Sequence, residues 1–158
     1  APSPERQKTM RHAQNVEYFT ALVPAAQTGT TLSSAIDCTD ADSCTIMIQF
    51  GAIAASGNLT TFALQSSATS GGTYADETGG AITDAVIGTA ALPADDDDDK
   101  LFVYEIDCKK LANRFLKVNI VGHGSNAATF GISGFKSRKT ESPAETAAGK
   151  GCEAVVRI

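Results

Sequence analysis

The stretch that decides the fold is residues 60–74, Thr-Thr-Phe-Ala-Leu-Gln-Ser-Ser-Ala-Thr-Ser-Gly-Gly-Thr-Tyr. Its first half alternates as a β-strand does, with Phe62 and Leu64 on one face and small or polar residues on the other. Its second half, residues 67–72, consists of serine, alanine, threonine and glycine, which predicts a sharp turn. A single strand with one apolar face is unstable in water, so this stretch predicts partner strands that share its core.

Alternating segments on both sides of this stretch supply the partners. The strongest is residues 44–53, whose even-numbered residues from Cys44 to Phe50 form one apolar face. Residues 101–107 and 115–121 show the same alternation. Weaker strands are expected at residues 16–23, 31–38, 73–76, 81–89 and 129–135, and a single helical turn at residues 109–113. The sequence therefore predicts an all-β fold, an antiparallel, jelly-roll-like β-sandwich of about eight strands.

Two of these strands have predicted ends. Pro24 lacks a backbone N–H and is expected to close the first strand. The Glu-Thr-Gly-Gly sequence of residues 77–80 is expected to end the strand at residues 73–76.

The chain of 158 residues is predicted to form one domain with extended ends. The β-sandwich is expected at residues 16–137. Residues 1–15 contain two prolines and four charges without any period, which is typical of an arm. Residues 138–158 are predicted to be a linker that ends in the β-prone Cys-Glu-Ala-Val-Val-Arg-Ile of residues 152–158. This terminal strand either joins its own sheet or reaches the sheet edge of a neighbouring molecule.

Charge is distributed unevenly along the chain. Residues 1–15 carry three basic and one acidic side chain (+2) and residues 136–158 carry five and three (+2), so the net charge of −5 leaves −9 on residues 16–135. An acidic body does not favour nucleic acid, because phosphate binding needs a clustered basic face. We find no run of about 18 apolar residues and no leader-like segment, so we expect neither a membrane span nor a signal peptide, and synthesis in the cytoplasm.

Residues that support catalysis are few. His123 lies between two glycines in a predicted turn, and the sequence contains neither a Gly-x-Ser-x-Gly motif nor a phosphate-binding glycine loop. We therefore expect no enzyme activity, no cofactor and no metal site. The acidic run at residues 95–99 is predicted to be a solvated loop, with a site for a hard cation as the alternative.

Four cysteines are present: Cys38, Cys44, Cys108 and Cys152. They form no C-x-x-C pair, and neither histidine lies at ligand spacing from a cysteine, so zinc is not expected. Free and mostly buried thiols are favoured for a protein of a reducing compartment, and disulfide bridges are the alternative left open.

The order of the segments resembles a known family. The segments are Cys-Thr-Ile-Met-Ile-Gln-Phe-Gly-Ala-Ile, then Thr-Phe-Ala-Leu-Gln-Ser-Ser followed by Ser-Gly-Gly-Thr-Tyr-Ala-Asp, then Lys-Leu-Phe-Val-Tyr-Glu-Ile-Asp, and then Arg-Phe-Leu-Lys-Val-Asn-Ile. Over residues 16–137 this order is similar to the small β-sandwich cement or decoration proteins of tailed bacteriophage heads. The long ends and the length of the acidic run are not part of that pattern.

This resemblance implies a structural protein of the virion, made in the host cytoplasm and mounted on the capsid surface as a dimer or trimer. There it would bridge subunits of the major capsid protein and stabilise the shell. The expected partners are the major capsid protein and further copies of this chain, without nucleic acid or membrane. The candidate capsid contacts are basic or apolar residues near the two ends: Arg6, Lys8, Arg11, Lys136, Arg138, Lys139, Val155, Val156 and Ile158.

Two alternatives stay open beside this function. One is another structural role in the neck or tail of the same particle. The other is a carbohydrate-binding β-sandwich, which is less favoured because the chain has no tryptophan and three tyrosines to stack on sugars.

Overall fold

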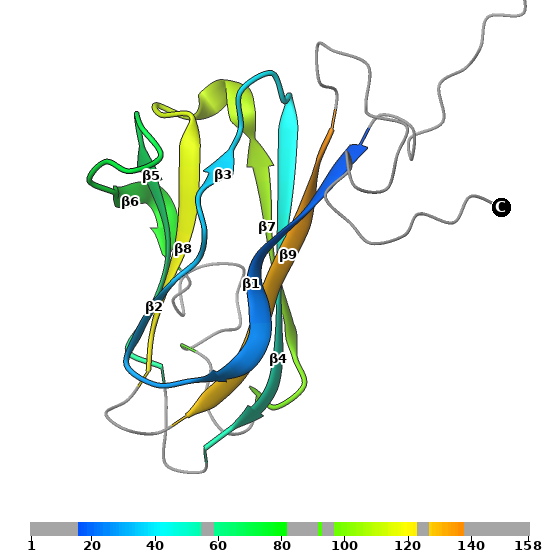
Figure 1. Cartoon of the computed structure of the whole chain (residues 1–158), viewed down its shortest axis with the longest axis vertical. Coiled ribbons are helices and arrows are strands. Elements are labelled where there is room, and N and C mark those ends of the chain that lie inside the picture. Colours follow the sequence, from blue (N-terminus) through cyan, green and yellow to red (C-terminus); the bar gives the residue numbers. More distant parts are fainter. Residues whose placement is uncertain (1–15, 55–58, 82–91, 93–96, 123–126, 138–158) are drawn as a thin grey trace, which may run out of the picture.

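The computed structural model describes residues 16–54, 59–81, 92, 97–122 and 127–137, which form two antiparallel β-sheets packed face to face (Figure 1). The first sheet contains, in order, β1 (Val16–Gln27), β9 (Ala128–Ser137), β4 (Ser43–Ile53) and β7 (Leu101–Asp107). The second sheet contains β2 (Thr30–Leu32), β8 (Phe115–Val121), β5 (Thr61–Ser67) and β6 (Ala75–Ala81), and β3 (Ile36–Asp37) also pairs with β8. The predicted all-β sandwich is confirmed.

Strands that are far apart in the sequence pair in a nested order. β1 pairs with β9, β2 with β8, β4 with β7 and β5 with β6, and every pair is antiparallel. The chain is therefore one long hairpin that turns back between β5 and β6, wound so that successive pairs lie in alternate sheets (Figure 1). This winding gives the strand order of a jelly roll.

The core lies between the sheets and consists of the inward residues of the alternating strands. Phe50 is at its centre, with its ring 5.3 Å from the ring of Phe130 and 5.5 Å from that of Phe102. Burying each large apolar side chain contributes about 1.5–3 kcal/mol. The most completely buried large side chains come from β4, β5, β8 and β9: Ile46, Ile48, Phe50, Phe62, Leu116, Val118, Ile120, Phe130 and Ile132.

The prediction that Pro24 ends the first strand is wrong, because β1 continues to Gln27. The register between β1 and β9 slips between Leu22 and Ala25, so that two residues of β1 lie opposite the single residue Gly131. Such a bulge omits a ladder hydrogen bond and so accommodates a residue without a backbone N–H. Gly131 also leaves room for the ring, since a Cβ there would lie 2.6 Å from Pro24 Cγ.

The single strand predicted at residues 31–38 is two short strands, β2 and β3, in the structure. Ser33 lies at the break and is buried. Its N–H donates to the Val118 carbonyl oxygen at 3.0 Å, and its hydroxyl accepts from the Val118 N–H at 2.9 Å, so a side chain replaces the backbone acceptor here. The N–H of Ser34 donates to the Ala21 carbonyl oxygen at 2.8 Å, which ties the second sheet to β1.

The prediction that residues 77–80 end the strand at residues 73–76 is also wrong, since residues 77–80 lie inside β6. Gly79 has a φ of +76°, and the register between β5 and β6 shifts beside Leu64. A Cβ on Gly80 would lie 3.1 Å from Leu64 Cβ, so the two strands approach closely at this point. The two glycines therefore form a bulge within the strand instead of a turn that ends it.

The helical turn predicted at residues 109–113 is a 3-10 turn that begins one residue earlier, η3 (Cys108–Lys110). Asp107 caps this turn, because its Oδ1 accepts from the Lys109 N–H at 3.1 Å. Several predicted features lie outside the described residues: the strand at residues 81–89 except Ala81, both arms, the terminal strand, His123 and Cys152.

Candidate functional site

Both ends of the described body lie at one end of the first sheet. Val16, the first residue of β1, pairs with Ser137, the last residue of β9. On its other side Ser137 pairs with Ser43, the first residue of β4, and the hydroxyls of these two serines share a hydrogen bond. Residues 1–15 and 138–158 therefore continue the chain from two adjacent strands, side by side.

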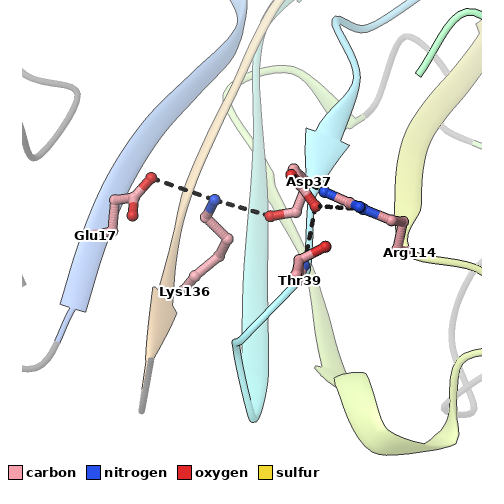
Figure 2. A network of polar contacts seen from close by, with 5 residues as sticks. All are labelled: Glu17, Asp37, Thr39, Arg114 and Lys136. Carbon is pink, nitrogen blue, oxygen red and sulfur yellow. Dashed lines mark hydrogen bonds and ion pairs between the residues drawn. The ribbon is translucent and has the colours of Figure 1, made fainter. Parts of the chain in front are cut away.

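A buried lysine, Lys136, lies next to these ends of β1 and β9. The side chain of Lys136 is 9% exposed, and its Nζ lies 3.3 Å from Glu17 Oε1 and donates to the Asp37 carbonyl oxygen at 2.9 Å. Figure 2 shows the ammonium of Lys136 between these two partners, which come from β1 and β3. A buried charge is stable only with such partners, so Lys136 joins strands of both sheets where the chain ends leave the body.

Asp37 extends this network to the surface (Figure 2). Arg114 donates from Nε and Nη2 to the two carboxylate oxygens at 3.2 and 2.8 Å, and the Thr39 N–H donates to Oδ1 at 3.0 Å. The Arg114 guanidinium holds the pKa of Asp37 well below its usual range, and the Thr39 contacts add to this effect against the opposing influence of partial burial. The same pairing raises the pKa of Arg114.

Lys136 is the one sequence-predicted capsid contact that lies within the described residues. It lies in β9, inside the predicted sandwich, and its ammonium is bound within the molecule by Glu17 and Asp37. The sequence alone could not show this, because both partners are distant in the chain. The remaining candidates lie outside the described residues: Arg6, Lys8, Arg11, Arg138, Lys139, Val155, Val156 and Ile158.

The outer face of β7 is a candidate surface that the sequence reasoning missed. Leu101 is 52% exposed and Val103 is 40% exposed. They pair with Gln49 and Met47 of β4, so an apolar group lies on the solvent side of the first sheet. The signal was present in Leu-Phe-Val-Tyr-Glu-Ile, residues 101–106, which is apolar on both faces of the strand where a solvated face is normally polar. Among the described residues β7 is also one of the two edge strands of its sheet, so it offers a partner both a face and an edge.

The described part of the acidic run is folded against β4. Asp98 Oδ1 accepts from the Ile53 N–H at 2.7 Å, and Gln49 Nε2 donates to two carbonyl oxygens of the same turn at 3.1 and 3.2 Å. Asp98 is exposed, as predicted for a loop, but it also satisfies a backbone donor of the core strand. Within the described ranges no group of three histidine, cysteine or acidic residues is placed to hold a metal ion, and residues 95 and 96 lie outside them.

Comparison with models of protein families, with curated proteins and with solved structures finds no match to this chain. In the part of the chain that the structure describes, no helix has the length and apolar character that a membrane crossing requires. The role of the molecule must therefore be inferred from its own residues and geometry.

Proposed function

We propose that this protein is a capsid cement or decoration protein. In this role it is a structural, non-catalytic component of a tailed-phage virion that binds the outside of the capsid and bridges neighbouring major capsid protein subunits. The order of its strands and turns, which resembles such proteins, motivates the proposal. The observation that carries it is the pairing of Val16 with Ser137, because it places the first and last described residues of the sandwich on adjacent strands, from which residues 1–15 and 138–158 continue.

Chain segments that continue from two adjacent strands suit a protein that bridges subunits. A compact sandwich would occupy one lattice site, and segments that continue from two adjacent strands would start close enough together to reach the same neighbouring subunit. A coil of about fifteen residues spans roughly 20 Å, which is enough to cross a subunit boundary. The fold adds limited support, because jelly rolls serve in viral capsid domains but also in lectins.

The composition of the two segments suits an acidic partner with exposed strand edges. Residues 1–15 carry a net charge of +2, and residues 138–158 carry four basic and three acidic side chains, which gives +1. Lys136 is left out of this count because its charge belongs to the body. Val155, Val156 and Ile158 offer apolar side chains to a neighbouring sheet.

Self-association is part of the same proposal. A lattice site of twofold or threefold symmetry is most simply filled by an oligomer of the same symmetry. The exposed Leu101 and Val103 on the edge strand β7 supply an apolar surface for such contacts. We therefore expect a dimer or trimer when the protein is mounted on the shell.

Empty shells of the same virus that lack this protein provide the test. Purified protein is mixed with the shells, which are then sedimented and analysed for composition. We expect saturable binding at a fixed ratio to the major capsid protein, and a higher temperature or force at which the shells rupture. Failure to bind the shells would contradict the proposal, and binding to isolated necks or tails instead would assign the protein there.

A further inference from the structure

Three thiols meet at the end of the sandwich that also contains η3. Cys38 follows β3, Cys44 is the second residue of β4, and Cys108 begins η3. Cys38 and Cys44 are 6% and 1% exposed, whereas Cys108 is only partly buried and packs against the same core. The cluster therefore contains one thiol that solvent reaches and two that it does not.

The backbone fixes these three residues next to one another. The N–H of Cys108 donates to the Asp42 carbonyl oxygen at 2.9 Å, and Cys44 pairs with Ile106 in the neighbouring strand. Cys44 belongs to the core between the sheets, and Ile106 and Cys108 pack against that core. Cys38 belongs to the second sheet, since its N–H donates to the Arg114 carbonyl oxygen at 2.8 Å.

The thiol of Cys38 is the centre of the cluster. Interactions with both Cys108 and Cys44 shift its pKa, and the interaction with Cys38 in turn raises the pKa of Cys108. The contact between Cys38 and Cys108 crosses from one sheet to the other. Cys44 lies in β4, which is hydrogen-bonded to β7 on one side and to β9 on the other. Cys108 lies at the start of a short turn, so it has more freedom to adjust its position.

We propose that Cys38 and Cys108 form a disulfide that links the two sheets when the protein meets a disulfide oxidant such as oxidised glutathione. The half-exposed Cys108 is the thiol that an oxidant reaches first, and Cys38 is the buried thiol in direct contact with it. This bond is independent of the proposed capsid function, because it requires only the cluster itself.

The reaction proceeds by two thiol–disulfide exchanges. The Cys108 thiolate attacks one sulfur of oxidised glutathione, which forms a mixed disulfide and releases one glutathione as its thiolate. The Cys38 thiolate then attacks the Cys108 sulfur and releases the second glutathione. In total the two protein thiols lose two electrons and two protons, and one molecule of oxidised glutathione is reduced to two thiols.

The surroundings of the cluster make this reaction slow at neutral pH. The contact with Cys108 lowers the pKa of Cys38, but the contact with Cys44 and burial outweigh it and raise that pKa to about 12. The contact with Cys38, together with burial, holds the pKa of Cys108 well above its usual range. Since the thiolate is the attacking species, the thiols persist when reduced, and oxidation accelerates as the pH rises.

The test uses the full chain with Cys152→Ser, so that three cysteines remain. The protein is incubated with oxidised glutathione at mildly alkaline pH, blocked with an alkylating agent and digested by a protease that cleaves before aspartate. Asp40 and Asp42 lie between Cys38 and Cys44, so this digestion places the two cysteines on different peptides. We expect a cross-linked peptide pair that contains Cys38 and Cys108, and an intact mass lower by two hydrogen atoms.

Thermal unfolding provides the second measurement. A cross-link that closes the chain from Cys38 to Cys108 restricts the unfolded state, so the oxidised protein should melt roughly 5–15 °C above the same protein treated with dithiothreitol. Cys44→Ser should keep both the cross-link and the shift, and Cys108→Ser, folded by circular dichroism, should lose both. A Cys38–Cys44 link, a lasting glutathione adduct on Cys108, or three alkylated thiols after the incubation would each overturn the inference.

Discussion

Val16 and Ser137 are paired across β1 and β9, so the first and last residues of the described sandwich lie next to each other. Ser137 also contacts Ser43 of β4 through its hydroxyl, and the neighbouring Lys136 bonds to Glu17 and Asp37. The ends of β1 and β9 are therefore held together and are tied by polar contacts to two other strands, β3 and β4.

The buried ammonium of Lys136 is expected to matter for stability. Lys136→Met removes the charge and leaves the Glu17 carboxylate and the Asp37 carbonyl oxygen without this donor, which should lower the free energy of unfolding by about 2–3 kcal/mol. Urea unfolding followed by circular dichroism measures this loss. Lys109→Met is the matched control, since the Lys109 side chain is 74% exposed and its ion pair with Asp42 should contribute little. Equal stability of both variants would show that the Lys136 network is not important for the fold.

The ion pair between Asp37 and Arg114 predicts a particular response to acid. Arg114 lowers the folded-state pKa of Asp37 below the unfolded value near 4, so the stabilisation is complete above that pH and is lost as the pH falls toward the folded-state pKa. The difference in urea midpoint between the wild type and Arg114→Gln should therefore be largest at neutral pH and should shrink below pH ~4. In an Asp37→Asn background the Arg114 substitution should have little effect. A difference that stays constant from neutral to acid pH would rule out this ion pair as its cause.

Gly134 should tolerate no side chain. A Cβ there would overlap the Thr45 carbonyl oxygen of the adjacent strand and would lie 2.7 Å from Phe19 Cζ. Because the Thr45 oxygen is backbone and cannot move aside cheaply, Gly134→Ala should lower the free energy of unfolding by about 3 kcal/mol. The exposed neighbour Ser133→Ala is the control and should change the urea midpoint only slightly. Wild-type stability of Gly134→Ala would mean that β4 and β9 are farther apart than described.

Within the acidic run, one residue, Asp98, is expected to stabilise the fold. Asp98→Ala removes the acceptor for the buried Ile53 N–H and should lower the free energy of unfolding by about 1–2 kcal/mol. Asp98→Asn keeps an oxygen at this position and should recover most of the loss. Asp99→Asn is the control, because Asp99 has a φ of +61°, which asparagine also adopts. Equal melting temperatures for all three variants would show that the Asp98 carboxylate contributes nothing to stability and that the run is only a solvated loop.

The fold was predictable where strict alternation set the strands. The segments at residues 101–107 and 115–121 coincide with β7 and β8, and the segment at residues 44–53 differs from β4 by one residue. Their apolar faces are the core, so the local pattern and the tertiary structure agree.

The wrong predictions share one physical cause: a distant residue changed the meaning of a local signal. Pro24 does not end its strand because Gly131 accommodates its ring, and residues 77–80 stay in β6 because Gly80 approaches Leu64. The burial of Lys136 was likewise not visible in the local sequence, because its partners lie in β1 and β3. No pattern within a short window contains these contacts.

The candidate site was predictable only in outline. The sequence predicts arms at both ends, which lie outside the described residues, but it does not show that residues 16 and 137 lie on adjacent strands, because this depends on the pairing of β1 with β9. The exposed apolar face of Leu101 and Val103 was visible in the sequence as a strand with two apolar faces. The sequence analysis counted this segment as one more alternating strand, and alternation alone does not show which apolar face meets solvent.

The affinity for empty shells of variants that lack residues 1–15 or residues 152–158 tests the proposed function most directly. Both variants should keep the circular dichroism spectrum of the full chain and should bind shells at least tenfold more weakly, since losing an apolar contact of about 60 Å² already costs ~1.4 kcal/mol. They should also lower the temperature at which decorated shells rupture. If both variants instead decorate shells as tightly as the full chain, the arms contribute nothing to binding, and the proposal that they hold the protein on the capsid is wrong.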